Sequence, residues 1–177
     1  MLMRVSAVWA KAEMMLATAL AVLVTGLVLL NVVTRNIGAA LFWVDELAIY
    51  AMVWMAFMGA SAALHYGNSV AITLISDAVA RPVAQVIRLF VHIVLTLFSF
   101  SMIYFCWRWF QPLDMLRAGF DIEAFQATTF NFVYSEPTTT LGVPKYVFWI
   151  VVWLFALGAS LHSTAHLLSW RAGGMSK

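Results

Sequence analysis

The chain is poor in charge and has a single cysteine, with 10% charged residues among 177. Cys106 has no partner for a disulfide within the chain, so cysteine usage does not indicate the redox compartment. An ordinary soluble domain has about 25% charged residues, and the low value here excludes that class. A phosphate-binding loop, a CxxC redox pair and a recognisable nucleophile–base–acid set are also missing from the sequence. We therefore expect no enzymatic activity.

Apolar residues dominate instead, at 64% of the chain, and the mean hydropathy is +0.92. Four long runs carry no Asp, Glu, Lys or Arg, and each approaches the roughly 20 residues that cross about 30 Å of hydrocarbon. We predict an all-α integral membrane protein, one membrane domain over residues 1–177. The spans are expected at approximately 14–34, 47–66, 89–107 and 146–170. The first run exceeds the roughly 7–15-residue core of a signal peptide, so we expect it to remain in the mature protein.

The connection between the second and third spans has a helical pattern of its own. A capping serine is followed by apolar residues at helical spacing, namely Ser69, Ile72, Ile75, Val79, Val83 and Val86. Pro82 suits the first turn of a following helix. We predict a short amphipathic helix in the membrane interface; a plain extension of the second span remains the alternative.

The distribution of positive charge indicates the orientation. With four spans both termini lie on one side, and Lys and Arg number six on that side against four on the other. The terminal side holds Arg4, Lys11, Arg81, Arg88, Arg171 and Lys177, and the opposite side holds Arg35, Arg108, Arg117 and Lys145. The excess favours cytoplasmic termini. Glu13 stays with the termini, and charge within the spans, the usual mark of an ion or proton path, is missing.

Histidines are the first candidates for metal or haem ligands. His162 and His166 lie at i and i+4 on one helix face, the spacing of paired metal ligands. No Glu, Asp or Cys stands at ligand spacing beside them, so we expect neither a metal site nor a cofactor. One alternative function stays open, a haem- or quinone-binding membrane anchor that uses His92 with His162 or His166 as axial ligands.

Three charged residues stand between the first two spans, where a membrane–water boundary is expected. A short turn brings the span ends together, so we predict that Arg35 pairs with Asp45 or Glu46, since an unpaired charge near lipid is costly. Three separately solvated charges are the alternative. Trp43 is expected to anchor the start of the second span at the interface.

Small residues mark surfaces on which helices can approach closely in a membrane. The second span has Ala56, Gly59, Ala60 and Ala63, the first has Ala17 and Ala21, and the fourth has Gly158. Packing within the chain or contact with a separate subunit would each use such a surface.

The longest connection, Arg108 to Lys145, is rich in aromatic residues, including Phe120, Phe125 and Phe130. So many aromatics predict a folded segment that packs on a partner or on the membrane surface. Its acidic residues Asp121 and Glu123 would suit docking of a partner, because charges can steer encounter.

Several short motifs, in their order and spacing, resemble one known family. They are N-V-V-x-R from Asn31, F-W-V-D-E-L-A from Phe42, W-M-A-F-M-G-A-S-A-A from Trp54 and L-G-V-P from Leu141. Over nearly the whole chain the sequence is similar to the small, DctQ-type membrane subunit of tripartite ATP-independent periplasmic (TRAP) transporters. The family pattern falls here on Arg35, Trp43, Glu46, Gly59 and Ala60.

The resemblance implies a function and partners. The chain would be a supporting subunit beside a large TRAP membrane subunit and a periplasmic solute-binding protein, in symport of an organic acid driven by an ion gradient. It would lie among lipids in the bacterial inner membrane, and no nucleic-acid partner is expected. Two features depart from the family: Ser69 and Thr73 stand where His and Asp are common, and the outer segment is longer.

Overall fold

The computed structural model describes residues 1–67 and 79–174. Over these residues the chain forms α1 (Leu2–Asn36), α2 (Phe42–Tyr66), α4 (Arg81–Phe110), α5 (Pro112–Arg117), α6 (Ile122–Thr129) and α7 (Tyr146–Gly174). Helices α1, α2, α4 and α7 are long and apolar enough to cross a membrane, which confirms the all-α class and the four spans. Each predicted span lies within one of these helices.

Helix α1 is longer than a membrane crossing requires. Its 35 residues extend over about 50 Å at about 1.5 Å per residue, compared with about 30 Å of hydrocarbon. The helix begins at Leu2, well before the expected span start at Met14. Glu13 consequently lies inside a continuous helix.

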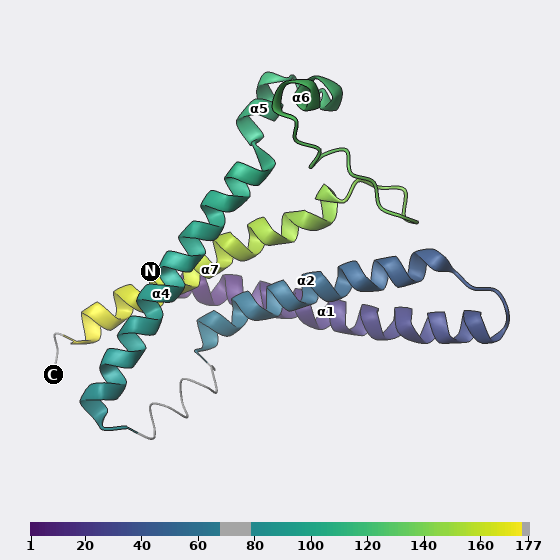
Figure 1. Cartoon of the computed structure of the whole chain (residues 1–177). Coiled ribbons are helices and arrows are strands. Elements are labelled where there is room, and N and C mark those ends of the chain that lie inside the picture. The colour runs from purple at the N-terminus through teal and green to yellow at the C-terminus, as the bar shows by residue number, and fades with distance from the viewer. Residues whose placement is uncertain (68–78, 175–177) are drawn as a thin grey trace.

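Helices α1 and α2 form an antiparallel hairpin (Figure 1). The turn between them uses Gly38 at φ +75°, a conformation that L side chains rarely adopt. Near the turn, Leu27, Val44 and Ala48 form a buried apolar cluster. The close packing of these apolar faces holds the two helices together.

Helix α7 joins the hairpin to the rest of the chain. It packs against α1, α2 and α4, and Ala17, Met58 and Val151 form a second buried cluster where α1, α2 and α7 meet. Helix α4 packs mainly on α7 and diverges from the hairpin toward its C-terminal end (Figure 1). Much of the α4 surface is therefore uncovered; Phe90, Leu97, Phe98 and Phe105 are all more than half exposed.

The outer segment between α4 and α7 is folded. Gln111, at φ 44°, separates α4 from α5, and a small core of Met115, Phe125 and Val133 packs α5 and α6 together. Tyr134 donates a hydrogen bond to the Phe110 carbonyl at 2.7 Å, which attaches the segment to the end of α4. This segment is the green part at the top of Figure 1.

Most of the predicted interfacial helix, including Ser69, Ile72 and Ile75, lies outside the described residues. Pro82 occupies the first turn of α4, as expected for a proline that begins a helix. Val83 and Val86 belong to α4 as well.

Candidate functional site

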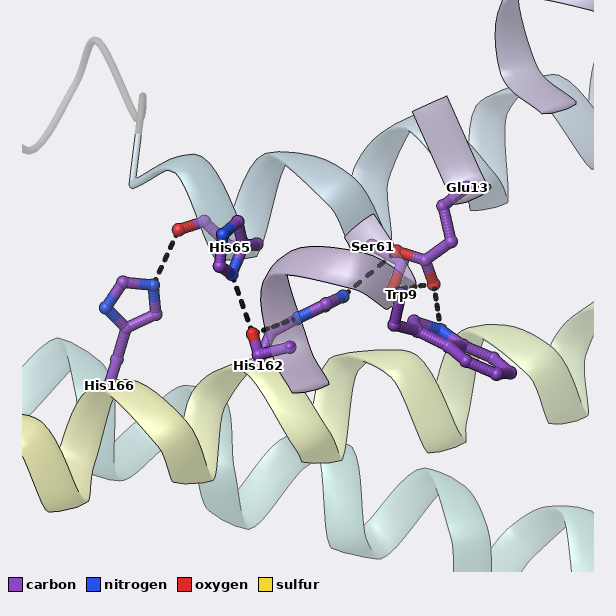
Figure 2. A network of polar contacts seen from close by, with 7 residues as sticks. Trp9, Glu13, Ser61, His65, His162 and His166 are labelled. Atoms are coloured by element: carbon purple, nitrogen blue, oxygen red, sulfur yellow. Dashed lines mark hydrogen bonds and ion pairs between the residues drawn. The ribbon is translucent and has the colours of Figure 1, made fainter. Parts of the chain in front are cut away.

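Polar side chains buried by α1, α2 and α7 form a network at the end of the bundle where both chain termini lie (Figures 1 and 2). Its centre is Glu13 of α1, which is 4% exposed. One carboxylate oxygen of Glu13 accepts hydrogen bonds from Trp9 Nε1 at 2.8 Å and from Ser61 Oγ at 2.7 Å. The other oxygen lies 2.9 Å from His162 Nε2 of α7. The carboxylate is therefore held by three helices.

The network continues through Ser6, whose hydroxyl lies between two imidazoles. Ser6 Oγ is 2.7 Å from His65 Nδ1 and 2.8 Å from His162 Nδ1. A hydroxyl has one proton, so Ser6 donates to one histidine and accepts from the other. If His162 is neutral and donates to Glu13, Ser6 donates to His162 and accepts from His65. If His162 is doubly protonated, both Ser6 bonds reverse.

Gly158 of α7 faces this carboxylate at close range. A Cβ at position 158 would collide with Glu13 Oε1, and it would lie 2.9 Å from Trp9 Nε1. A glycine is therefore required for α7 to approach the carboxylate closely enough for His162 to reach it.

Serine, histidine and glutamate in hydrogen-bond contact have the composition of a hydrolytic triad. Here Ser6 and His162 are both fully buried, at 0% exposure, so no substrate can reach the serine hydroxyl. A buried polar network whose members are satisfied makes a core rigid and specifies one arrangement. The arrangement joins α1, α2 and α7 in one register.

The histidines lie close together but have different partners. His166 Nε2 donates to the His65 carbonyl at 2.7 Å, and the His166 ring is nearly parallel to that of His92, with centroids 5.6 Å apart. His162 uses both ring nitrogens, toward Ser6 and Glu13. An axial haem ligand needs a nitrogen free for iron, so His162 does not suit that role. Within the described residues, no group of three or more His, Cys, Asp and Glu could hold a metal ion.

Sequence reasoning missed Glu13 as a site residue, because the first span was expected to begin at Met14, whereas α1 begins at Leu2 and buries Glu13. Glu13 was assigned to the terminal side because it precedes the uncharged run. One signal could have found it: Ser6, Ala10, Glu13 and Ala17 follow at helical spacing, and all four are buried in the structure. A carboxylate within a stripe of small residues predicts a close, polar helix contact.

At the opposite end of the hairpin, Arg35 and Asp45 form the pair that the sequence predicts. Arg35 Nη2 lies 2.6 Å from Asp45 Oδ2, and Asn31 hydrogen-bonds to both side chains. The side chains are 58% and 40% exposed, so the pair contributes only about 0–1 kcal/mol. Trp43 lies in the first turn of α2 and is 40% exposed.

Glu46 makes a different contact, with the loop that precedes α7. Its carboxylate accepts hydrogen bonds from the backbone amides of Thr139 at 2.8 Å, Thr140 at 2.6 Å and Leu141 at 3.2 Å. The Thr140 hydroxyl donates a fourth bond at 2.7 Å. Glu46 thereby attaches this loop to the start of α2.

The two acidic residues expected to dock a partner differ in their surroundings. Asp121 caps α6 and accepts hydrogen bonds from the amides of Glu123 at 2.9 Å and Ala124 at 3.2 Å. Glu123 is exposed in the first turn of α6.

In the same outer segment, the hydrogen bond from Lys145 to Glu136, 2.6 Å long, raises the pKa of the lysine.

The small-residue surfaces divide into two kinds. Ala17 and Gly158 are packed inside the chain. Ala60 and its neighbours one turn away on α2 face outward: Ala56, Ala60 and Ala63 are exposed, and a Cβ added at Gly59 would meet nothing within 4 Å. The α2 small-residue face, defined here as Ala56, Gly59 and Ala60, is left uncovered by the part of the chain that the structure describes, whereas Ala63 borders a cavity between α2, α4 and α7.

Four apolar helices, a polar network that holds three of them together and charged contacts at the far end define a multi-pass α-helical membrane protein. The family model described as tripartite ATP-independent periplasmic transporters, DctQ component, matches residues 24–173, and the chain belongs to this family. It is a small membrane subunit of a TRAP transporter, a component that works with a large membrane subunit and a solute-binding protein. The curated proteins and the solved structures give no match.

Proposed function

We propose that the chain is a non-catalytic subunit that supports the large transport subunit and helps to dock the solute-binding protein, for ion-gradient-driven uptake of an organic acid. The observation that carries the proposal is the family match together with the uncovered α2 small-residue face. Glu13 is the only buried acidic residue in the described helices, and it is paired with His162 and enclosed among side chains. This enclosure suits a supporting role.

Family membership and the charge distribution together support an orientation. The family works with a periplasmic protein, and the excess of Lys and Arg on the terminal side favours a cytoplasmic location for both termini. The protein would then lie in the bacterial inner membrane, with Arg35 and the segment of α5 and α6 on the periplasmic side.

The α2 small-residue face is the proposed contact with the large subunit. Without a hydrophobic driving force between helices in lipid, close backbone approach at small residues stabilises their association. Gly59 and Ala60 are the family-pattern positions on this face.

Substitution of Gly59 tests this contact. Gly59→Leu should lower the amount of large subunit that copurifies with the chain about tenfold, because overpacking at a close contact costs about 1–3 kcal/mol. The chain itself should keep its helicity, since no atom lies within 4 Å of the added Cβ position. The measurement is the subunit ratio after affinity purification from membranes.

Gly26→Leu is the matched control, because Gly26 of α1 also has nothing within 4 Å of an added Cβ. An equal loss of the large subunit with both variants would show that the effect is not specific to α2. Solute uptake by proteoliposomes that contain this chain and no large subunit would contradict the proposed supporting role.

A further inference from the structure

A cavity of about 160 Å³ lies between the end of α2, the N-terminal half of α4 and the last turns of α7. Its volume corresponds to about five water molecules at about 30 Å³ each. Three of its lining side chains are basic or can become so, namely Arg88, His92 and His166. The described lining contains no acidic residue.

The polar and apolar parts of the lining lie at different depths. Arg88 is near the start of α4, and Leu95 lies about 10 Å farther along the helix at about 1.5 Å per residue. On α2, Gly67 is at the helix end and Leu64 is one turn farther in. The cavity is therefore polar toward the helix ends and apolar toward the middle of the membrane.

The polar end favours an anion. His166 already uses Nε2 to donate to the His65 carbonyl, so its other ring nitrogen, which points away from His65 in Figure 2, is the one left for another group. Arg88 supplies a permanent charge with donors that match phosphate oxygens.

The ligand must also fit the apolar part of the cavity, which lies between the helices toward the middle of the membrane. A free anion makes no favourable contact with the apolar side chains of Leu64 and Leu95. A phospholipid can place its phosphate at the polar end of the cavity and its acyl chains beside these apolar side chains. Anionic lipids are recognised by basic pockets between helices on the cytoplasmic side of a membrane. The helix segments that line the cavity belong to the end of the bundle that carries both termini, and Figure 1 shows where that end lies.

We propose that this cavity binds the phosphate of an anionic phospholipid from the leaflet on the terminal side, with Arg88 and His92 as its donors and an acyl chain along Leu95. The site joins the N-terminal half of α4 to α2 and α7. A bound lipid would thus stabilise the position of α4.

Native mass spectrometry of the full-length chain in a non-ionic detergent tests the proposal, with titrations of phosphatidylglycerol and of phosphatidylcholine. The wild-type chain should bind phosphatidylglycerol more tightly. Arg88→Gln should weaken that binding about fivefold and leave phosphatidylcholine unchanged, since one Arg near an anionic surface is worth about 1 kcal/mol. Arg4→Gln is the control, because Arg4 is exposed at the same end of the bundle and does not line the cavity.

If Arg88→Gln loses helicity, His92→Leu carries the same comparison and should also lower the affinity for phosphatidylglycerol. An equal loss with Arg4→Gln would show an unspecific effect of surface charge and would overturn the site. Equal affinity of the wild-type chain for the two lipids would overturn it as well. Displacement of the lipid by inorganic phosphate at comparable concentration would assign the cavity to a free anion instead.

Discussion

Glu13 shows how much one side chain depends on its neighbours. Its carboxylate is buried, yet Trp9, Ser61 and His162 donate to it, so the desolvation cost is offset by charge-assisted hydrogen bonds. Removal of one partner from such a buried pair leaves the other uncompensated, at a cost of about 3–5 kcal/mol. The absence of a side chain at Gly158 is as necessary as the three donors, because it allows α7 to approach.

Gly158→Ala should therefore destabilise the chain. Alanine is about 1 kcal/mol better than glycine in a helix interior, but the new Cβ would collide with Glu13, and overpacking costs about 1–3 kcal/mol. Thermal unfolding in detergent, followed by helicity, should show a lower midpoint. Gly26→Ala is the control, since its Cβ would meet nothing within 4 Å and the midpoint should stay or rise. A Gly158→Ala midpoint equal to that of Gly26→Ala would mean that α7 does not approach the carboxylate as described.

At the scale of an element, the first turn of α2 connects two separate parts of the chain. Asp45 and Glu46 are adjacent in sequence, but consecutive helix residues do not face the same direction. Asp45 forms an ion pair with Arg35 at the end of α1, whereas Glu46 accepts hydrogen bonds from the loop at residues 139–141. One helical turn thus positions both the hairpin end and the loop that leads into α7.

Glu46→Gln should loosen that loop. A glutamine keeps one acceptor oxygen, and its amide group would place donors against the backbone donors of Thr139, Thr140 and Leu141. Hydrogen exchange of these three amides should become faster, while exchange within α6 stays unchanged. Glu123→Gln is the control, because it removes an equal charge from the exposed face of α6. Unchanged exchange at residues 139–141 in Glu46→Gln would show that the carboxylate does not hold this loop.

At the scale of the whole molecule, the described helices form an open arrangement. Helix α4 diverges from the α1–α2 hairpin, and its outer end carries α5 and α6 away from it (Figure 1). The open shape and the uncovered α2 small-residue face are consistent with a subunit that completes its packing on a partner.

The proposed docking of the solute-binding protein by α6 predicts an effect on uptake. The double variant Asp121→Asn with Glu123→Gln should slow uptake at limiting binding protein and low ionic strength, with a smaller effect in high salt, because steering charges are screened. Asparagine caps helices about as well as aspartate, so α6 should remain intact. The measurement is initial uptake by proteoliposomes that contain the assembled membrane complex.

Asp114→Asn with Glu136→Gln serves as the charge-matched control, because these two acids are already paired with Arg117 and Lys145. Uptake equal to wild type in the Asp121 and Glu123 double variant, with the complex intact, would show that these charges have no docking role. An equal reduction in the control would indicate a general effect of outer charge.

Composition and the lengths of the apolar runs were sufficient to predict the class of protein and its four long helices. These properties depend on local hydrophobicity and on the thickness of a bilayer, and both can be evaluated one segment at a time. The motif order around Arg35, Glu46 and Gly59 was likewise sufficient for the family, which the match over residues 24–173 then established.

Contacts between segments far apart in the chain were decided only by the tertiary structure. Glu13 meets His162 across 149 positions, and Glu46 meets Thr140 across 94. No local pattern contains such a pairing, because it depends on the order and crossing of helices whose apolar surfaces are nearly equivalent in lipid. The same reason separates Gly158 from Gly59: both are glycines in apolar helices, and only the packing of α7 against α1 places one inside the bundle and leaves the other on its surface.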